Sequence, residues 1–344
     1  MKKLPKKILV IRNDKLGDFM LSYPSFALLK QALPDCETFA LVPGYTKEMA
    51  EACPWIDHVM IDPGKDSGLT GLRALISSFR NYKIDAAITL FSTARIGFAL
   101  MAAGIPYRLA PATKVAQIFY NHRLTQRRSR SEKPEYAYNL DLVRDFLLSH
   151  NIAVPDLPQP PYLHFDDQQV RELRQAFCTA HQLDSQKPLI FIHPGSGGSA
   201  NNLSLTQYQQ LAENLASKIG INLVISAGPG ELPYAEQLSA QLGNRKHTVY
   251  PSTEGLRQFA QHIQFADVFI SGSTGPLHIA GALNTATAAF YPRRRSATPL
   301  RWQTLNSEDK RLAYSPPESA AEQDMSAIDM NHAVNEIYQK FLAS

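Results

Sequence analysis

Continuous apolar segments alternate with helical segments along most of this chain, and this alternation constrains the fold most strongly. In the first half, β-rich apolar runs are separated by segments with helical spacing; the runs are 7–12, 37–42, 58–62 and 85–91. One of the expected helices covers 19–33, and another ends at Gly104, where a left-handed cap suits glycine. Strands without apolar–polar alternation are buried on both faces, as in a parallel sheet covered by helices. The first half therefore predicts a doubly wound α/β domain.

The pattern stops in a proline-rich segment and then starts again. Four prolines lie between Pro155 and Pro161, where they disfavour helix and remove backbone donors. Further apolar runs follow, again separated by helical segments: 188–195, 221–228, 267–272 and 286–291, of which the last is expected to close the sheet. The sequence thus predicts two successive doubly wound domains with a cleft between two nucleotide-binding halves.

The composition excludes several other classes of protein. The chain has 35 Lys and Arg against 31 Asp and Glu, a net charge of +4, and 44% hydrophobic residues. These values are typical of a soluble globular protein and too weakly basic to indicate nucleic-acid binding. Cys36, Cys53 and Cys178 lack metal-ligand spacing, so we expect buried free thiols in a reducing compartment. No apolar run approaches the ~18 residues that cross a bilayer, and no secretory signal is recognisable, so a cytoplasmic location is expected.

The loop Asn13-Asp14-Lys15-Leu16-Gly17-Asp18 directly follows the first predicted strand. Open α/β sheets bind ligands at the carboxyl ends of their strands. Gly17 permits a tight turn, and Asp18 fits either a helix N-cap or a carboxylate that faces a ligand. The loop matches neither the dinucleotide fingerprint nor the Walker lysine loop, which disfavours dehydrogenases and P-loop proteins.

Two Gly- and Ser-rich turns follow predicted strands of the second half. The first contains His193, Pro194, Gly195, Ser196, Gly197 and Gly198, and the second contains Ser273, Thr274 and Gly275, with Pro276 and His278 in the helix that follows. Free backbone N–H groups and a helix N-terminus favour a bound phosphate. The alternatives are plain strand-to-helix turns and a structural histidine.

Two basic stretches are further candidates for binding anions. One contains Arg123, Arg127, Arg128, Arg130 and Lys133, and the other is Arg293-Arg294-Arg295. Each fits either a solvated loop or a docking surface for a phosphorylated or carboxylated substrate. No set of His, Asp or Glu has zinc spacing, so no metal site is expected, and no nucleophile elbow is present.

Three of these motifs together resemble glycosyltransferase family 9, the ADP-heptose:lipopolysaccharide heptosyltransferases and their relatives. They are RNDKLGDFMLSYP, HPGSGG and SGSTGPLHIAGAL, and Glu135, Asn139, Arg301 and Trp302 extend the resemblance over most of the chain. The family implies a glycosyltransferase-B fold, an α/β architecture of two Rossmann-like doubly wound domains facing across a cleft. It implies an acceptor-binding domain, a donor-binding domain and a C-terminal helix that packs back on the first domain; the corresponding ranges are 1–155, 156–325 and 326–344.

The resemblance implies inverting, metal-independent sugar transfer without a cofactor. The expected donor is the nucleotide-sugar ADP-heptose, and the acceptor is a lipopolysaccharide core or another glycan. Asp18 matches the general base, which accepts a proton as the acceptor hydroxyl attacks the anomeric carbon. The turns that contain His193–Gly198 and Ser273–His278 match the donor-binding motifs. Arg12 and Lys15 would neutralise phosphates.

The family's setting also implies peripheral contact with the cytoplasmic face of the inner membrane. Lys2, Lys3, Lys6, Lys7 and the stretch 122–133 supply cations that could face anionic lipid.

Two departures from the family pattern leave the donor open. Many members carry a lysine after the HPGS-type turn, where this chain has Asn201 and Asn202, and several have an aspartate where Ser273 stands. Another nucleotide-sugar, a sugar-nucleotide epimerase of the same fold and a non-catalytic binding protein are the alternatives. Arg127, Arg128 and Arg130 argue against an epimerase, which needs no separate acceptor.

Overall fold

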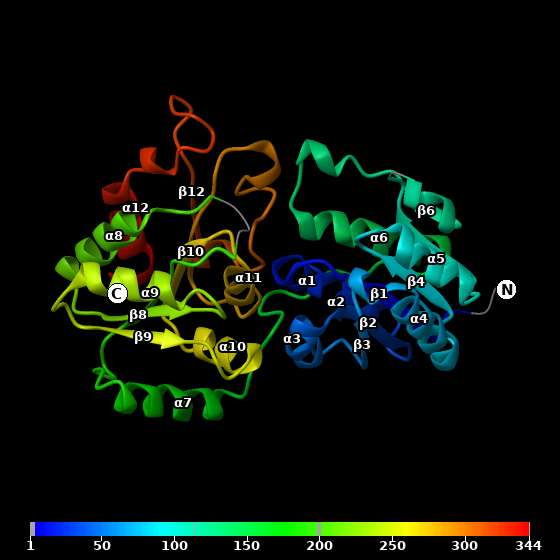
Figure 1. Cartoon of the computed structure of the whole chain (residues 1–344), viewed down its shortest axis with the longest axis horizontal. Coiled ribbons are helices and arrows are strands. Elements are labelled where there is room, and N and C mark those ends of the chain that lie inside the picture. The colour runs from blue at the N-terminus through cyan, green and yellow to red at the C-terminus, as the bar shows by residue number, and fades with distance from the viewer. Residues whose placement is uncertain (1–3, 114, 198–200, 344) are drawn as a thin grey trace. The chain divides into compact units, whose positions relative to one another are not determined.

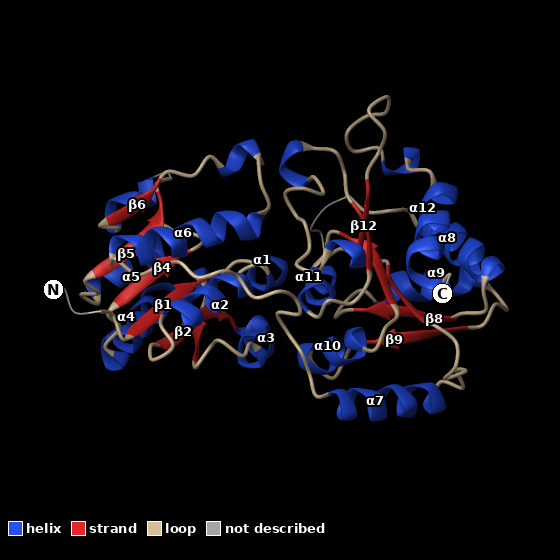
Figure 2. Cartoon of the chain, turned by 180° about the vertical axis from the view of Figure 1, so that it is seen from behind, coloured by secondary structure: helices blue, strands red, loops and turns tan. Residues whose placement is uncertain are grey.

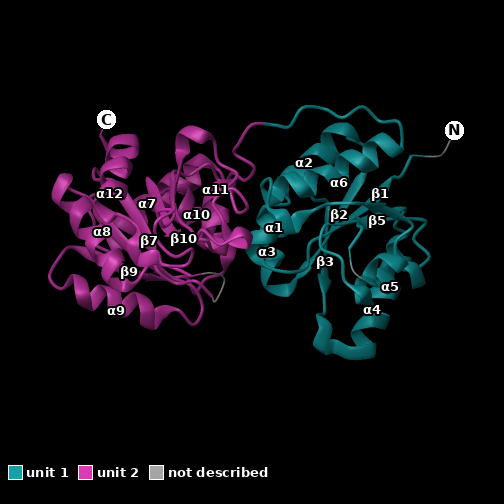
Figure 3. Cartoon of the chain, turned by 90° about the horizontal axis from the view of Figure 1, so that it is seen from above, with its two compact units in different colours: residues 1–158 teal, residues 159–344 magenta. Residues whose placement is uncertain are grey.

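The structure is a computed structural model that describes residues 4–113, 115–197 and 201–343. The chain divides into two compact units, Met1–Pro158 and Gln159–Ser344 (Figure 3). The division falls inside the proline-rich segment, where the sequence predicts a linker. Each unit contains a six-stranded sheet whose neighbouring strands are all parallel.

Unit 1 is a doubly wound α/β unit with the strand order β3-β2-β1-β4-β5-β6 (Figure 1). Its strands are β1 (Lys7–Ile11), β2 (Glu37–Pro43), β3 (His58–Asp62), β4 (Ala86–Thr89), β5 (Tyr107–Pro111) and β6 (His122–Leu124). Its helices are α1 (Leu16–Met20), α2 (Tyr23–Ala32), α3 (Lys47–Ala52), α4 (Gly68–Tyr82), α5 (Ala94–Ala102), α6 (Glu135–Ser149) and the 3₁₀ helices η3 (Val115–Phe119) and η4 (Arg128–Arg130). Helices α2 and α6 cover one face of the sheet, and α4 and α5 cover the other (Figure 3). Strand β1 is central and buried for this reason.

Unit 2 repeats this architecture, with the strands drawn in red in Figure 2. Its strand order is β12-β11-β10-β7-β8-β9. Its strands are β7 (Leu189–His193), β8 (Asn222–Ala227), β9 (His247–Pro251), β10 (Val268–Gly272), β11 (Thr287–Phe290) and β12 (Arg311–Tyr314). Its helices are α7 (Asp167–Ala180), α8 (Leu205–Lys218), α9 (Leu232–Leu242), α10 (Leu256–Gln264), α11 (Gly275–Ala282) and α12 (Met330–Ile337). In both units the first strand along the chain lies inside the sheet, so the loop after it opens onto the middle of the carboxyl edge.

All eight predicted strands are present, but the prediction that the run 286–291 closes the sheet is wrong. Strand β12 pairs with β11 on its outer side. It has only four residues, of which three are partly or fully exposed, so it lacks the apolar run of a buried strand. The single helix expected over 19–33 is wrong as well. The segment belongs to two helices, because the chain turns at Leu21 and Ser22 before α2 begins. Pro24 lies in the first turn of α2, where its missing N–H is harmless.

The C-terminal helix α12 belongs to unit 2. Met330, Ala333, Val334 and Ile337 of α12 are buried in the core of unit 2, against α8. The apolar face of α12 is therefore satisfied within its own unit.

Two smaller expectations are confirmed. Gly104 follows α5 with φ +80°, a left-handed conformation that glycine adopts without strain. Cys36, Cys53 and Cys178 are buried free thiols. Within the described ranges, no helix combines the length and the hydrophobicity needed to cross a membrane.

Two adjacent leucines of α6 test how the core of unit 1 is packed. Leu147 is 0% exposed and Leu148 is 64% exposed. We expect Leu147→Ala to lower the free energy of unfolding by about 2–5 kcal/mol, because it leaves a cavity. Leu148→Ala should change it by less than about 0.5 kcal/mol. Urea unfolding followed by circular dichroism measures both, and equal effects would contradict the described orientation of α6.

Candidate active site

A buried group of charged side chains lies at the carboxyl edge of the sheet in unit 1. It comprises Arg12, Asp14, Asp18, Arg128 and Glu135, and we call it the Arg12 cluster. Arg12 directly follows β1, Asp18 lies in α1, and Glu135 is the first residue of α6. The cluster thus joins three elements, one of them more than a hundred residues away along the chain.

The guanidinium of Arg12 connects the cluster. Its Nε donates to Asp14 Oδ1 at 2.9 Å, its Nη1 donates to Glu135 Oε1 at 2.8 Å, and its Nη2 donates to Asp18 Oδ1. Arg128 Nη1 donates to the same oxygen of Glu135 at 2.7 Å. Arg12 and Glu135 are almost fully buried. Arg12 is therefore committed to carboxylates, and the expectation that it neutralises a phosphate has no support from this geometry.

Asn139 fixes the guanidinium from one turn further along α6. Arg12 Nη1 donates to Asn139 Oδ1 at 3.1 Å, and Asn139 Nδ2 donates to the backbone oxygen of Leu21 at 3.2 Å. Residues four apart on a helix share one face, so Glu135 and Asn139 reach the same group. The end of α1 and the start of α6 are thereby held together.

The charges in the Arg12 cluster do not balance, and this sets the chemistry of Asp18. Three carboxylates face two guanidinium groups. Burial raises the pKa of Asp18 to about 7; Arg12 opposes this rise, while Asp14 and Glu135 add to it. Asp18 therefore exchanges its proton near neutral pH, as a general base must.

Asp18 is not an N-cap, so that alternative is wrong. The residue before α1 is Lys15, and Asp18 is the third residue of the helix. Its Oδ1 accepts from Arg12, and among the described residues none donates a hydrogen bond to Oδ2. One oxygen is thus held in place while the other can receive a proton.

A second group of polar side chains surrounds Asp62, the last residue of β3, and includes Asn13 from the loop that follows β1. Asp62 accepts hydrogen bonds from Asn13 Nδ2 at 2.5 Å, from Arg95 Nη2 at 2.6 Å and from the N–H of Gly64 at 2.9 Å. Burial alone would raise the pKa of Asp62, but Arg95, Gly64 and Asn13 hold it below its usual range. Asn13 Oδ1 and Arg95 Nη1 are buried and have no hydrogen-bond partner among the described residues. Such atoms are costly unless something binds them, so they indicate a polar subsite.

In unit 2, His193 ends β7 and contacts the carboxylate of Glu231. His193 Nε2 lies 3.2 Å from Glu231 Oε2, and its Nδ1 lies 3.1 Å from Ser226 Oγ. The N–H groups of Gly197 and Gly228 donate to Glu231 at 2.9 and 3.1 Å. The contact with His193 is the largest of the effects that lower the pKa of Glu231, so it stays ionised.

The glycines around Glu231 are required by its position. A Cβ on Gly195 would lie 2.2 Å from the carboxyl carbon of Glu231, and one on Gly228 would lie 2.9 Å from its Oε2. Gly197 has φ +52°. The turn that the sequence predicts as an anion cradle therefore uses the N–H of Gly197 for a carboxylate of the protein itself.

The turn after β10 begins a regular helix. Thr274 is the N-cap of α11 and accepts a hydrogen bond from the N–H of Leu277. Gly275 and Pro276 are the first two helical residues. His278 is buried, its Nδ1 has no partner among the described residues, and burial lowers its pKa to about 4. Any contact that His278 makes with a phosphate is therefore that of a neutral ring.

Asn202 joins the two turns of unit 2. The N–H of Gly272 donates to Tyr208 Oη, and Tyr208 Oη donates to Asn202 Oδ1 at 2.7 Å. Asn202 Nδ2 donates to the backbone oxygen of Pro194 at 2.9 Å. Asn202 thus holds the first turn against the second.

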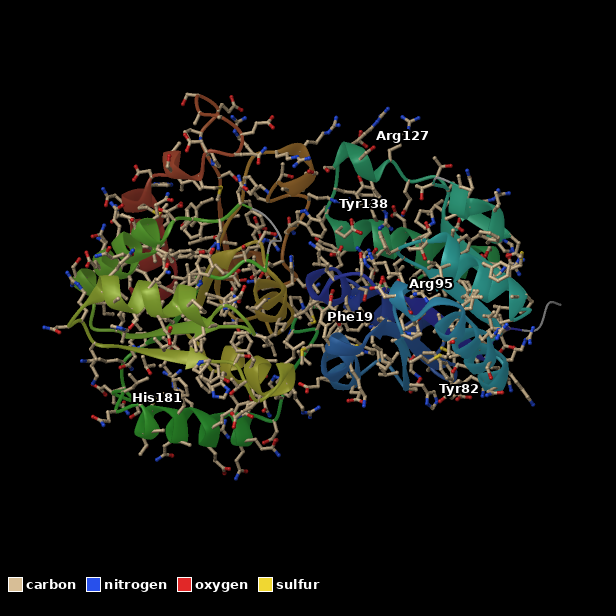
Figure 4. All side chains as sticks on the ribbon, in the orientation of Figure 1. Phe19, Tyr82, Arg95, Arg127, Tyr138 and His181 are labelled. Carbon is tan, nitrogen blue, oxygen red and sulfur yellow. The ribbon has the colours of Figure 1, made fainter. Side chains whose placement is uncertain are left out.

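The predicted cations lie in different surroundings. Arg123, Arg127 and Arg130 are exposed, and Arg127 projects away from the rest of unit 1 (Figure 4). Arg293 donates to backbone oxygens of Glu318 and Ala320, whereas Arg294 and Arg295 are exposed after β11. Lys2, Lys3 and Gly198 lie outside the described residues.

Comparison with known proteins decides the family. A family model described as Glycosyltransferase family 9 (heptosyltransferase) matches residues 72–329. The chain belongs to glycosyltransferase family 9. A Haemophilus influenzae protein provisionally named a glycosyltransferase is 47% identical to it over 333 residues, which are 96% of either chain. This makes the family 9 protein an enzyme that transfers a sugar, rather than an epimerase or a non-catalytic binding protein.

Solved structures show the fold of this glycosyltransferase. The structure of Escherichia coli ADP-heptose lipopolysaccharide heptosyltransferase II matches with a TM-score of 0.80 at 19% identity, over 98% of this chain and 99% of that chain. That of E. coli heptosyltransferase WaaC with ADP matches with a TM-score of 0.72 at 16% identity, over 97% and 99%. The two units are accordingly the two Rossmann-like domains of a glycosyltransferase-B fold.

Sequence reasoning found the loops but missed several side chains that complete them. The resemblance includes Glu135 without a role, and Asp62, Arg95 and Glu231 go unnoticed. Asp62 is the last residue of β3, which pairs with β2, and Glu231 follows β8, which pairs with the first strand of unit 2. A search for carboxylates after every predicted strand would have found both.

Two glutamates on either side of Lys133 test the Arg12 cluster. Glu135 is buried between two guanidinium groups, whereas Glu132 forms an exposed pair with Arg130 at 3.5 Å. We expect Glu135→Gln to lower the free energy of unfolding by about 2–4 kcal/mol, because it removes the buried carboxylate to which both Arg12 and Arg128 donate. Glu132→Gln should cost less than about 0.5 kcal/mol. Denaturant unfolding at pH 8 measures both, and a neutral Glu135→Gln would show that the cluster is not a structural anchor.

Proposed function

We propose that this family 9 enzyme transfers heptose from ADP-heptose onto a lipopolysaccharide core, with inversion and without a metal, in the cytoplasm. The observation that carries the proposal is Asp18, a buried carboxylate at the carboxyl edge of unit 1 whose pKa is about 7. The choice of donor is supported by relatives of known structure, whose names include ADP-heptose and ADP. The family itself supports sugar transfer.

Asp18 is the general base of the proposed reaction. As the acceptor hydroxyl attacks the anomeric carbon, its O–H bond breaks and the proton passes to Asp18 Oδ2. The new C–O bond forms as the bond from the anomeric carbon to the diphosphate oxygen breaks, and ADP leaves. One displacement inverts the anomeric centre, and no covalent intermediate with the protein forms. Arg12 keeps the carboxylate oriented through Oδ1.

Unit 2 holds the donor in this proposal. The N–H of Gly275 at the start of α11, together with Ser273 and Thr274, binds the diphosphate in this proposal, and the helix dipole favours its negative charge; Pro276 has no N–H, and that of Leu277 is donated to Thr274. Arg294 and Arg295 supply the positive charge that a lysine provides in many family members. Glu231 stays ionised and can accept hydrogen bonds from ribose hydroxyls, a common role for a carboxylate beside such a turn.

Unit 1 holds the acceptor. Asn13 and Arg95 offer one acceptor atom and one donor atom to a polar sugar group beside the Asp18 loop. The exposed Arg123, Arg127 and Arg130 fit the phosphates or carboxylates of a lipopolysaccharide core. Lys15 lies three residues before Asp18 and adds a cation to the same loop.

Thermal unfolding with a panel of nucleotides tests the donor. We expect ADP to raise Tm, and ADP-heptose to raise it more. A ligand at ~100 times its Kd adds about 2.7 kcal/mol to the free energy of unfolding, which corresponds to a rise in Tm of about 2–4 °C. UDP, a UDP-sugar and NAD serve as controls and should have no effect. A shift with UDP ligands alone would discard heptose and retain sugar transfer.

Replacing Asp18 tests the general base. We expect Asp18→Asn to lower kcat by 10²–10⁴-fold, the usual contribution of a general base, and to change the Kd for ADP by less than about twofold. Asp14 also accepts a hydrogen bond from Arg12, and Asp14→Asn should lower kcat far less than Asp18→Asn does. ADP release with a heptose-deficient lipopolysaccharide core measures turnover. If Asp18→Asn keeps more than about a tenth of the rate, Asp18 is not the base.

The pH profile should report the same group. Because the folded-state pKa of Asp18 lies near 7, its active, deprotonated form gains population as pH rises, so kcat/KM should increase through about pH 7. Glu135 raises this pKa, so Glu135→Gln should move the midpoint to lower pH. A flat profile between pH 5.5 and pH 8 would contradict the assignment.

A further inference from the structure

An exposed aromatic ring lies beside the loop that contains Asp18. Tyr45 belongs to the 3₁₀ helix η1 (Gly44–Thr46), which follows β2, and β2 pairs with β1. Tyr45 is 59% exposed, and its hydroxyl donates a hydrogen bond to the backbone oxygen of Asp14 at 2.8 Å. A surface side chain held in this way loses less rotamer freedom when a ligand binds than a side chain without a partner. The ring is therefore preorganised for contact with a ligand.

The ring and Asp18 share one corner of the carboxyl edge. The side chains of Asp14 and Asp18 both accept hydrogen bonds from Arg12, and the backbone of Asp14 accepts one from Tyr45. Burial is the largest of the effects that raise the pKa of Tyr45, and the carboxylates of Asp14 and Asp18 also raise it. Near a solvent-exposed group, charges have such an effect only over short distances. A sugar that lies on the Tyr45 ring is thus next to the loop of the proposed base.

Asn13 and Arg95 add hydrogen-bonding atoms to this corner without adding charge. Asn13 directly precedes Asp14, and its Nδ2 donates to Asp62. Asn13 Oδ1 and Arg95 Nη1 are buried and have no hydrogen-bond partner among the described residues. Asp62 accepts from Arg95 Nη2 at 2.6 Å, so the charges of this pair compensate each other. One acceptor and one donor beside a compensated ion pair fit hydroxyl groups better than a carboxylate or a phosphate.

The chemistry of this corner selects the kind of group that binds there. The face of an aromatic ring carries partial negative charge, so it attracts C–H groups with partial positive charge and repels anions. A pyranose presents such C–H groups on its faces, while its hydroxyls point outward to hydrogen-bonding partners. The carboxylates of Asp14 and Asp18 act on Tyr45 and would repel an acidic sugar. These features together fit a neutral sugar.

We propose that a neutral sugar ring of the acceptor stacks on Tyr45, with its hydroxyls directed to Asn13 Oδ1 and Arg95 Nη1. The inference rests on the proposed function, which places the acceptor in unit 1, and it names the class of sugar that receives the transfer. Tyr45 is a positioning residue, because it holds the acceptor hydroxyl near Asp18 and takes up no proton.

Ligand-observed NMR measures sugar binding without turnover. The full-length protein is titrated at pH 8 with the methyl glycosides of glucose, galactose and mannose, and with methyl glucuronide, which carries a carboxylate. We expect at least one neutral glycoside to bind, with the strongest saturation transfer at its ring C–H protons. Methyl glucuronide should bind at least about fivefold more weakly than the best neutral glycoside, because of repulsion by the nearby carboxylates.

Replacing Tyr45 tests the ring itself. Tyr45→Ala should weaken binding of the neutral glycoside about tenfold and raise KM for the acceptor core about tenfold. It should lower kcat by less than about threefold and leave the Kd for ADP within about twofold, because the proton transfer and the donor site do not involve Tyr45. Tyr45→Phe keeps the ring and loses only the hydrogen bond to Asp14, so its binding should stay within about threefold of the parent.

Tyr234→Ala is the matched control. Tyr234 is 58% exposed, almost the same as Tyr45, and belongs to α9 of unit 2. This variant should bind the glycosides as the unchanged protein does. Because both tyrosines are largely exposed, the Tm of every variant should stay within about 2 °C of the parent.

Three results would overturn the proposal. One is that none of the neutral glycosides binds the unchanged protein, and another is that Tyr45→Ala binds them as tightly as the unchanged protein does. The third is that methyl glucuronide binds as tightly as the neutral glycosides, which would exclude a site for a neutral sugar. Failure of the proposed reaction looks different, because ADP release with the acceptor core would then be absent while the glycosides still bind in a manner that depends on Tyr45.

Discussion

The burial of Arg12 determines which side chains must surround the carboxyl end of β1 in unit 1. A guanidinium removed from water needs carboxylates and well-placed acceptors, or its burial costs several kcal/mol. Asp14 and Asp18 come from the loop and helix after β1, and Glu135 and Asn139 come from α6. The start of α6 must therefore lie against the end of β1. The same requirement that stabilises the fold at this edge also places Asp18 where an open α/β sheet binds its ligand.

Unit 2 also surrounds a charged group with hydrogen-bond partners, but there the charge is negative. There the charged group is a half-buried carboxylate: Glu231 accepts from the N–H groups of Gly197 and Gly228 and contacts His193. Because these two backbone N–H groups donate to Glu231, they are not available to a phosphate. The diphosphate of a donor is then left to the N-terminus of α11 and to exposed arginines. Asn202 holds the two turns together through its contacts with Pro194 and Tyr208.

The sequence predicts what depends on local patterns. The apolar runs identify eight strands, whereas β5, β6 and β9, like β12, are not predicted. The loop after the first run contains Asp18, which the family resemblance marks as the candidate base. Strand β12 escapes prediction because a short, half-exposed edge strand has no apolar run. The placement of α12 escapes it because an amphipathic helix shows which of its faces is buried but not which core receives it. The partnership of Arg12 with Glu135 depends on tertiary structure, so no local pattern contains it.

The imbalance of charge in the Arg12 cluster contributes to the raised pKa of Asp18, and this makes a structural ion-pair cluster suitable for proton transfer. If each buried carboxylate had its own cation, the pKa of Asp18 would fall, and a weaker base would remain. Three carboxylates shared between two guanidinium groups leave one carboxylate undercompensated, and burial raises the pKa of Asp18 to about 7. Asp14 is held by Arg12 through Nε, and Glu135 is shared by both arginines. Asp18 contacts Arg12 through Oδ1, and none of the described residues donates to its Oδ2, so Asp18 can take up a proton without losing that contact.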